Sequence, residues 1–279
     1  MVRIIADTST LYSTGQAVEA GFFVSPLSVT INGRSYREFD EITPEEFVEI
    51  IHQGHLPTSS QPAVGDVAQL YEQFPDEEII NIAMADGLSG TYNSAVAAAG
   101  LCEHEDKITV LNSRTLCGPH RHLVEKAVKL AREGLAKADI LARLKKLMDS
   151  SKSFLMPADF DYLRRGGRLS PLVSYVGGAM RLVPIMTLTE DCRHLTVATI
   201  RRSFAQAVKH VIKLIDECGD GAGWKIYISH ADVPDMAEMA RKQLEERFPA
   251  AVIEIYGLSP VFITQGGPGC MAIQTIQED

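Results

Sequence analysis

Three segments of the sequence place hydroxyl, amide or guanidinium groups beside glycine or proline, a combination suited to holding an anionic group. Thr58-Ser59-Ser60-Gln61-Pro62 offers three consecutive hydroxyls and an amide. Gly87-Leu88-Ser89-Gly90-Thr91 offers two hydroxyls in a glycine-rich turn. Arg164-Arg165-Gly166-Gly167-Arg168 concentrates three guanidinium groups around a glycine pair. Each segment has a functional interpretation and a purely structural one.

The hydroxyls of Thr58–Ser60 come just before a helix that the apolar spacing predicts over Pro62–Phe74. Proline is favoured at the first helical position, and a preceding hydroxyl can cap the helix by accepting a backbone hydrogen bond. Capping uses only one hydroxyl, so Ser59 and Ser60 leave at least one to face a ligand. Both interpretations stay open.

Ser89 and Gly90 lie in a turn between a strand predicted over Ile79–Ala85 and a helix predicted to begin near Thr91. In an open α/β sheet such turns bind ligands, because backbone N–H groups and the helix dipole converge there on an anion. The structural alternative is a tight turn in which Ser89 only caps the helix.

A stand-alone acyl hydrolase would use Ser89 as its nucleophile, in a turn of the G-x-S-x-G kind. Thr91 occupies the position where that motif has its second glycine, and no histidine is linked to Ser89 in sequence. The sequence therefore disfavours a self-sufficient enzyme and predicts no catalytic residue, with the hydrolase kept as an alternative.

The arginine-rich segment is a local positive feature in a chain whose 27 basic and 36 acidic residues sum to −9. A guanidinium pairs well with phosphate or carboxylate, which indicates a phosphate or an acidic partner, whereas the structural alternative is a solvated loop. No basic cluster is dense enough to neutralise a row of phosphates, so nucleic acid is not expected as a partner.

Histidine and cysteine are grouped at His52-x-x-His55 and at Cys117-x-x-His120-x-His122, but neither group is followed by the second pair that a structural zinc site needs. The glycine-rich turns match neither the dinucleotide pattern nor the P-loop pattern. We therefore expect no metal and no ATP or NAD cofactor.

Two α/β domains are expected, because 279 residues exceed what one hydrophobic core usually serves. Residues 1–152 alternate strands with helices, which predicts a Rossmann-like domain with a doubly wound parallel sheet and a hairpin inserted at Leu27–Arg37. Residues 153–279 contain many strands and two helices, predicted over Phe204–Cys218 and Asp235–Phe248. This pattern predicts a C-terminal α/β domain with a mixed or antiparallel sheet.

No apolar stretch reaches the ~18 residues of a membrane span, and Asp7 comes too early for a signal peptide. Five cysteines, an odd number with no C-x-x-C pair, indicate buried thiols rather than disulfides. We expect a cytoplasmic protein without an integral membrane segment.

Five motifs, taken in order, resemble those of the DegV family: Ile4–Thr10, Thr58–Pro62, Leu88–Ala95, Tyr162–Ser170 and Gly267–Gly269. Each motif is weak alone, but their order and spacing make the match specific, and it spans the whole chain. The resemblance implies a two-domain α/β fold with a fatty acid in a tunnel between and within the domains. It also implies the carrier subunit of a fatty acid kinase, whose separate ATP-binding subunit phosphorylates the bound carboxylate for phospholipid synthesis.

The resemblance further implies which residues bind the carboxylate. Hydroxyls of Ser59, Ser60 and Ser89, with the amide of Gly90, would hold it. Ser59 keeps the hydroxyl of a threonine that is usual in the family. Gln265, two residues before the Gly-Pro-Gly motif, stands in the place of a common histidine and is expected beside the head group.

Arg168, with Arg202 as a second candidate, is expected by the same resemblance to contact the kinase subunit or the transferred phosphate, clear of the buried tail. Val183 replaces a lysine that is usual before the following Pro-Ile pair. A carrier is favoured physically, because each methylene removed from water gains roughly 0.8 kcal/mol. The alternatives are the Ser89 hydrolase and a lipid-responsive regulatory protein.

Overall fold

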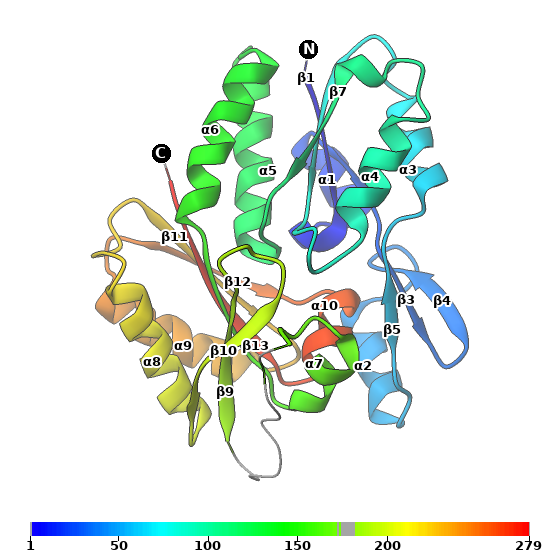
Figure 1. Cartoon of the computed structure of the whole chain (residues 1–279). Helices are drawn as coiled ribbons and strands as arrows, with labels where there is room; N and C mark the ends of the chain where they lie inside the picture. Colours follow the sequence, from blue (N-terminus) through cyan, green and yellow to red (C-terminus); the bar gives the residue numbers. More distant parts are fainter. Residues whose placement is uncertain (1, 172, 174–181, 279) are drawn as a thin grey trace.

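The computed structural model describes residues 2–171, 173 and 182–278, whose strands form three sheets (Figure 1). The first sheet is parallel, in the order β2–β1–β6–β7. Its strands are β1 (Val2–Asp7), β2 (Phe23–Ser25), β6 (Glu78–Ala83) and β7 (Ile108–Asn112).

Helices cover both faces of this parallel sheet. Neighbouring residues of each strand point to opposite sides, so each strand contributes apolar side chains to a core on both faces. Ile4 and Ile80 pack into one core with helices α1 (Thr14–Ala20), α5 (Cys117–Arg132) and α6 (Lys137–Ser150). Ile5 and Ile79 pack on the other side with α3 (Val64–Tyr71) and α4 (Thr91–Ala99). The predicted doubly wound sheet is confirmed.

The chain leaves β1 toward β2 on one side and later places β6 on the other, so the winding direction changes between β1 and β6. Ligands of open α/β sheets bind outside the carboxyl ends of the strands at such a point. A hydrogen bond joins the carboxyl ends of β1 and β6 there, because the Met84 N–H donates to Asp7 Oδ2 at 2.9 Å.

The second sheet has six strands in the order β10–β9–β8–β13–β11–β12. They are β8 (Lys152–Met156), β9 (Val183–Leu188), β10 (Leu195–Arg201), β11 (Trp224–His230), β12 (Val252–Gly257) and β13 (Met271–Gln277). Among the described pairs β11 and β12 run parallel and the others antiparallel, which confirms the predicted mixed sheet. Helices α8 (Phe204–Asp216) and α9 (Pro234–Arg247) cover one face.

A third, antiparallel sheet joins β3 (Ser28–Ile31) to β4 (Arg34–Arg37) and β5 (Thr58–Ser60). Asn32 and Gly33 have φ values of 50° and 72°, the left-handed pair that a two-residue hairpin needs, so the predicted hairpin is confirmed. Helix α2 (Pro44–His52) follows the hairpin.

The helix predicted from Pro62 begins later, and the prediction that Thr58–Ser60 caps it is wrong. These residues form β5, whose Ser59 pairs with Val29 of β3, and α3 begins at Val64. Pairing with β3 holds the segment extended, and the residue that precedes α3, Ala63, makes no side-chain cap bond.

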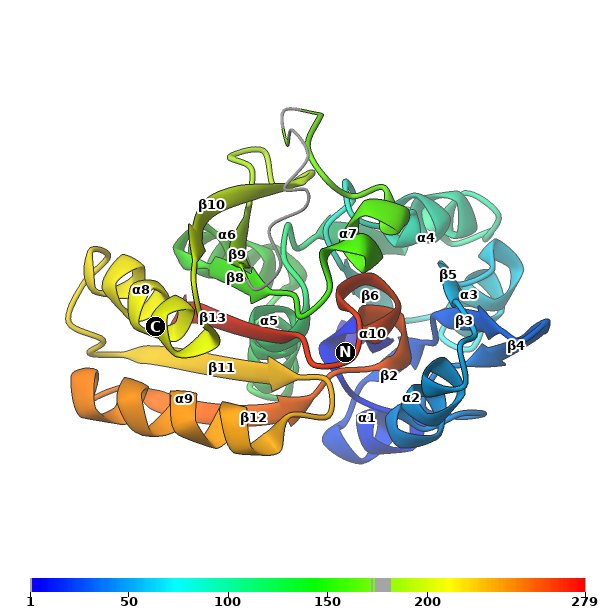
Figure 2. The same cartoon turned by 90° about the horizontal axis from the view of Figure 1, so that it is seen from below.

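Two short helices, α7 (Phe160–Gly166) and α10 (Pro260–Gly266), were not predicted. They pack on each other, and α10 also contacts α2, β3 and β5 (Figure 2).

Strands of the first sheet end at Asn112 and those of the second begin at Lys152, but α5 packs against strands of both. The domain boundary at residue 152 therefore stays a prediction. Within the described ranges, no helix is long and apolar enough to cross a membrane.

Candidate functional site

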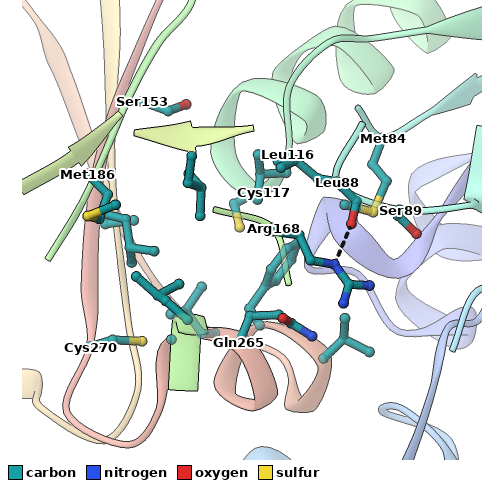
Figure 3. Close-up of a pocket in the computed structure, with 18 of the residues that line it drawn as sticks. Met84, Leu88, Ser89, Leu116, Cys117, Ser153, Arg168, Met186, Gln265 and Cys270 are labelled. Carbon is teal, nitrogen blue, oxygen red and sulfur yellow. Dashed lines mark hydrogen bonds between the residues drawn. The ribbon is translucent and has the colours of Figure 1, made fainter. Parts of the chain in front are cut away.

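A pocket lies where the parallel sheet, β5, α10 and the mixed sheet meet, and it encloses about 1020 Å³ of space, part of it open to solvent. Most of its wall is apolar, with side chains such as Leu27, Met84, Leu88, Leu155, Met186 and Phe262. Its polar lining residues are Ser59, Ser60, Gln61, Ser89, Ser153, Arg168, Gln265 and Gln274. Figure 3 shows Ser89 and Arg168 on one side of the pocket and Ser153 and Met186 on the other.

Three residues predicted from separate motifs line this pocket. Ser59 of β5 accepts a hydrogen bond at 3.0 Å from Nε2 of Gln265, which α10 supplies. Ser89, in the turn between β6 and α4, lies 2.8 Å from the Thr91 hydroxyl and accepts from the Thr91 N–H at 3.3 Å. Because a hydroxyl that accepts one bond still has a proton to donate, Ser59 can serve an anion as well.

Two glycines make room for the amides at this polar end. A Cβ added to Gly90 would lie 2.4 Å from Gln61 Oε1, and one added to Gly166 would lie 2.1 Å from Gln265 Oε1. Any side chain at these positions would displace the amide facing it. Gly90 thus contributes by its lack of a side chain, and α4 begins directly after it.

Arg168 lines the pocket, and the expectation that a bound tail stays clear of it stays a prediction. Its Nε donates to the Leu88 carbonyl at 3.0 Å, and its Nη1 donates to the Gly166 carbonyl. These two bonds fold the side chain back from α7 over the turn that carries Ser89. Burial lowers the pKa of Arg168, but a guanidinium remains charged at neutral pH.

The electrostatics of the pocket favour an anion. Among the described residues that line it, Arg168 is the only charged one, and no described carboxylate forms an ion pair with it. A guanidinium has five N–H donors, of which two are used on carbonyls. The remaining donors and the uncompensated charge can bind a carboxylate or a phosphate.

The other arginines singled out from the sequence lie elsewhere. Arg164 forms an exposed ion pair with Asp161, at 3.2 Å, and Arg165 lies over the ring of Tyr162. Arg202 is exposed between β10 and α8 and does not line the pocket. A contact of Arg168 or Arg202 with a partner stays a prediction.

A buried carboxyl group fixes the helix that carries Gln265. Glu38 is fully buried, accepts from the Thr8 hydroxyl, and accepts from the Val261 N–H of α10 at 3.0 Å. Burial raises the pKa of Glu38 to about 7, and the nearby Asp7 adds to the rise. The position of α10 therefore depends on a group that titrates near neutral pH.

The geometry does not equip Ser89 as a nucleophile. Its hydrogen-bond partner is Thr91, and no histidine is found among the described residues that line the pocket. A serine–histidine pair does occur at Ser9, whose hydroxyl lies 2.6 Å from His120 Nδ1, but both side chains are buried in the core. His120 Nε2 donates to the Ile82 carbonyl, which makes this pair structural.

Metal ligands do not converge anywhere in the described ranges, where no group of three or more His, Cys, Asp or Glu could hold an ion. The cysteines are free thiols. Cys102, Cys117 and Cys270 are buried as expected, whereas Cys192 is partly exposed and Cys218 is exposed.

Sequence reasoning missed three polar residues of the pocket. Gln61 directly follows the predicted serines. Ser153 and Gln274 lie on β8 and β13, opposite each other in the strand pairing. A glutamine within a largely buried strand was the one available signal for Gln274.

Comparison with known proteins shows which family the chain belongs to. A family model described as "Uncharacterised protein, DegV family" matches residues 1–278. The DegV domain-containing protein SA1258 of Staphylococcus aureus (strain N315) is 30% identical over 280 residues, covering 99% of both chains. The chain belongs to the DegV family.

Solved DegV structures share the fold. A DegV family protein from Thermus thermophilus, described by its fatty acid binding, is 25% identical with a TM-score of 0.90, covering 99% of both chains. DegV from Bacillus subtilis, described as a fatty acid binding protein, is 24% identical with a TM-score of 0.88, also covering 99% of both chains. The DegV fold thus extends over the whole chain.

Proposed function

We propose that the protein binds a long-chain fatty acid in this pocket and presents the carboxylate for phosphorylation by a separate kinase subunit. The observation that carries the proposal is the polarity of the pocket. Among the described lining residues the one charged group is a cation, Arg168, which Figure 3 shows on the same side as Ser89, and apolar side chains form most of the lining.

The head group would lie between Ser59, Ser89 and Arg168. The two hydroxyls can each donate one hydrogen bond to a carboxylate oxygen, and the guanidinium supplies the opposite charge. Gln265 holds Ser59 in place through the bond at 3.0 Å. Hydrogen bonds to a charged group are worth about 1.5–3 kcal/mol each, which fixes one end of the ligand.

The tail would lie along the apolar wall. Each methylene removed from water gains roughly 0.8 kcal/mol, so a tail of ~16 carbons gains on the order of 12 kcal/mol before the costs of ordering. Leucine and methionine suit such a surface, because methionine adapts to an irregular or flexible ligand. The DegV proteins from T. thermophilus and B. subtilis, described as binding fatty acids, support the same class of ligand.

The polar side of the pocket is also where a partner could reach the carboxylate. Ser60 and Gln61 line the pocket and are exposed, so this side adjoins solvent. The sequence carries no nucleotide-binding motif, so the phosphoryl donor would be bound by another protein. The resemblance of the five motifs to kinase-associated carriers supports this second step.

Titration of the delipidated protein tests the binding step. We expect saturable binding of fatty acids of about 14 to 18 carbons, at one site per chain, and weaker binding of fatty alcohols of the same length. Equal affinity for acid and alcohol would contradict the proposed carboxylate site, and no binding of either would refute the carrier function.

Two assays separate the carrier from the alternatives. With a cognate ATP-binding subunit and ATP, the bound acid should be converted to an acyl phosphate, and neither protein alone should form it. A chromogenic acyl ester should remain uncleaved without ATP. Turnover of that ester, abolished in Ser89→Ala, would instead support the hydrolase.

A further inference from the structure

Gln274 places a buried polar group in the wall of the pocket, away from the head-group side. It lies on β13 and is 2% exposed. Its Nε2 donates to the Leu116 carbonyl at 3.0 Å and to Ser153 Oγ at 2.8 Å. Because a carbonyl only accepts, the contact with Leu116 fixes which end of the amide is nitrogen.

The oxygen of the same amide has no donor. Within the described part of the chain, Gln274 Oε1 is buried without a hydrogen-bond partner. A buried polar atom left unpaired loses its interaction with water and gains nothing in return. The two bonds of Nε2 explain a structural role for the nitrogen, but they leave the oxygen unexplained.

Ser153 supplies the complementary group. It pairs directly with Gln274 across β8 and β13 and lines the same pocket. Since its Oγ accepts from Gln274 Nε2, its own proton remains to be donated. Both residues line the pocket, and between them they hold one unpaired acceptor and one hydroxyl proton.

These groups interrupt an apolar surface. The neighbouring row of the sheet is Ala272, Leu155 and Met186, which are paired with each other across three strands and all line the pocket. Figure 3 places Ser153 on the opposite side from Ser89, so the pair faces the tail of a bound acid and not its carboxylate. A plain hydrocarbon tail offers neither a donor nor an acceptor.

We propose that Gln274 and Ser153 form a second polar subsite that binds a hydroxyl group carried on the acyl chain, so that hydroxy fatty acids are preferred ligands. The inference rests on the proposed fatty-acid binding and specifies its ligand. An alcohol O–H donates to Gln274 Oε1 while its oxygen accepts from Ser153, which satisfies both protein groups together. An unsubstituted tail leaves Oε1 unpaired, which lowers its relative affinity.

The experiment compares stearic acid with isomers that carry a hydroxyl near the middle of the chain, further along it, or at its terminal carbon. Wild-type protein should bind at least one isomer about tenfold more tightly than stearic acid. Gln274→Met keeps the side-chain volume but removes the acceptor, so this preference should disappear while stearic acid still binds. Gln277→Met, an exposed glutamine on the same strand, should leave the preference unchanged.

Ser153→Ala provides the second variant and carries the test if Gln274→Met does not fold. It removes the hydroxyl donor, and with it the acceptor of one Nε2 bond, but leaves Gln274 Oε1 in place. It should reduce the preference several-fold. The inference is overturned if wild-type protein prefers no isomer, or if the preference survives in the folded subsite variants. If stearic acid and every hydroxylated isomer fail to bind, the proposed fatty-acid binding itself is refuted. If stearic acid binds and the hydroxylated isomers bind with equal affinity, only the proposed polar subsite is refuted.

Discussion

Replacing Arg168 with methionine should separate the charge of the head-group site from its apolar surface. The substitution keeps an unbranched side chain of similar length but removes the one charged group among the described residues of the pocket lining. It also removes the donors to the Leu88 and Gly166 carbonyls. A fatty acid should lose affinity, and an uncharged alcohol of equal length should lose much less.

The expected loss follows from the environment of the guanidinium. A hydrogen bond between charged groups contributes about 1.5–3 kcal/mol. Arg168 is only partly buried, so solvent screening places the loss near the lower end, about 1.5–2 kcal/mol or roughly 10- to 30-fold in affinity. The wild-type affinity for the acid should also fall as salt is raised, and the affinity of the variant should respond less.

Isothermal titration of both ligands into wild type, Arg168→Met and Arg164→Met would test this account. Arg164 lies on α7, four residues before Arg168, but is exposed and paired with Asp161, so its variant should bind as wild type does. Equal losses for acid and alcohol would mean that Arg168 only shapes the wall. An unchanged affinity for the acid would place the carboxylate elsewhere.

Other substitutions test the neighbouring groups. Ser89→Ala and Ser59→Ala should each weaken fatty-acid binding by about 1.5–3 kcal/mol without unfolding the protein, as titration and thermal melting would show. Gln265→His should add a step in affinity between pH 6 and 7.5 that wild type lacks, and identical pH profiles would exclude a place beside the head group. The pKa of Glu38 is about 7 in the folded protein, above the ordinary value of 4.5, so folding takes up a proton between pH 4.5 and 7. The contribution of Glu38 to stability therefore falls as the pH rises from 4.5 to 7. Glu38→Gln should remove that trend, on the order of 3 kcal/mol, in denaturant unfolding; parallel pH curves for the two proteins would contradict the shift.

The alternation of strands and helices was sufficient to predict both large sheets. The parallel sheet needs buried strands such as Glu78–Ala83 separated by helices with one apolar face, and both are local patterns. The hairpin at Asn32 and Gly33 was equally local, because only a few residues tolerate both left-handed conformations. These features are encoded within a short stretch of chain.

Features that depend on distant pairing were not predictable in the same way. Thr58–Ser60 has polar side chains and a following proline, and it is extended because β3 offers it an edge. The position of Arg168 depends on carbonyls of its own turn and of Leu88, which lies 80 residues away. The composition of the arginine-rich segment predicted an anion site, but the chain alone did not show that the Arg168 side chain lines the pocket.

The role of Gln274 also depends on residues that are distant in the sequence. A glutamine in a β-strand has no local sign of whether its amide is satisfied by neighbours or left facing a cavity. That depends on Ser153, 121 residues away, and on the Leu116 carbonyl, 158 residues away. By contrast Ser59, Ser89 and Gln265 were found because their motifs resemble those of the family.

Mass spectrometry of an organic extract from the freshly purified, folded protein tests the central claim most directly. The account predicts a long-chain fatty acid at about one molecule per chain, lost when an isotopically labelled acid is exchanged into the pocket. The acid should also be depleted in Arg168→Met relative to Arg164→Met. An extract free of fatty acid, from protein that then takes up no labelled acid, would contradict the account.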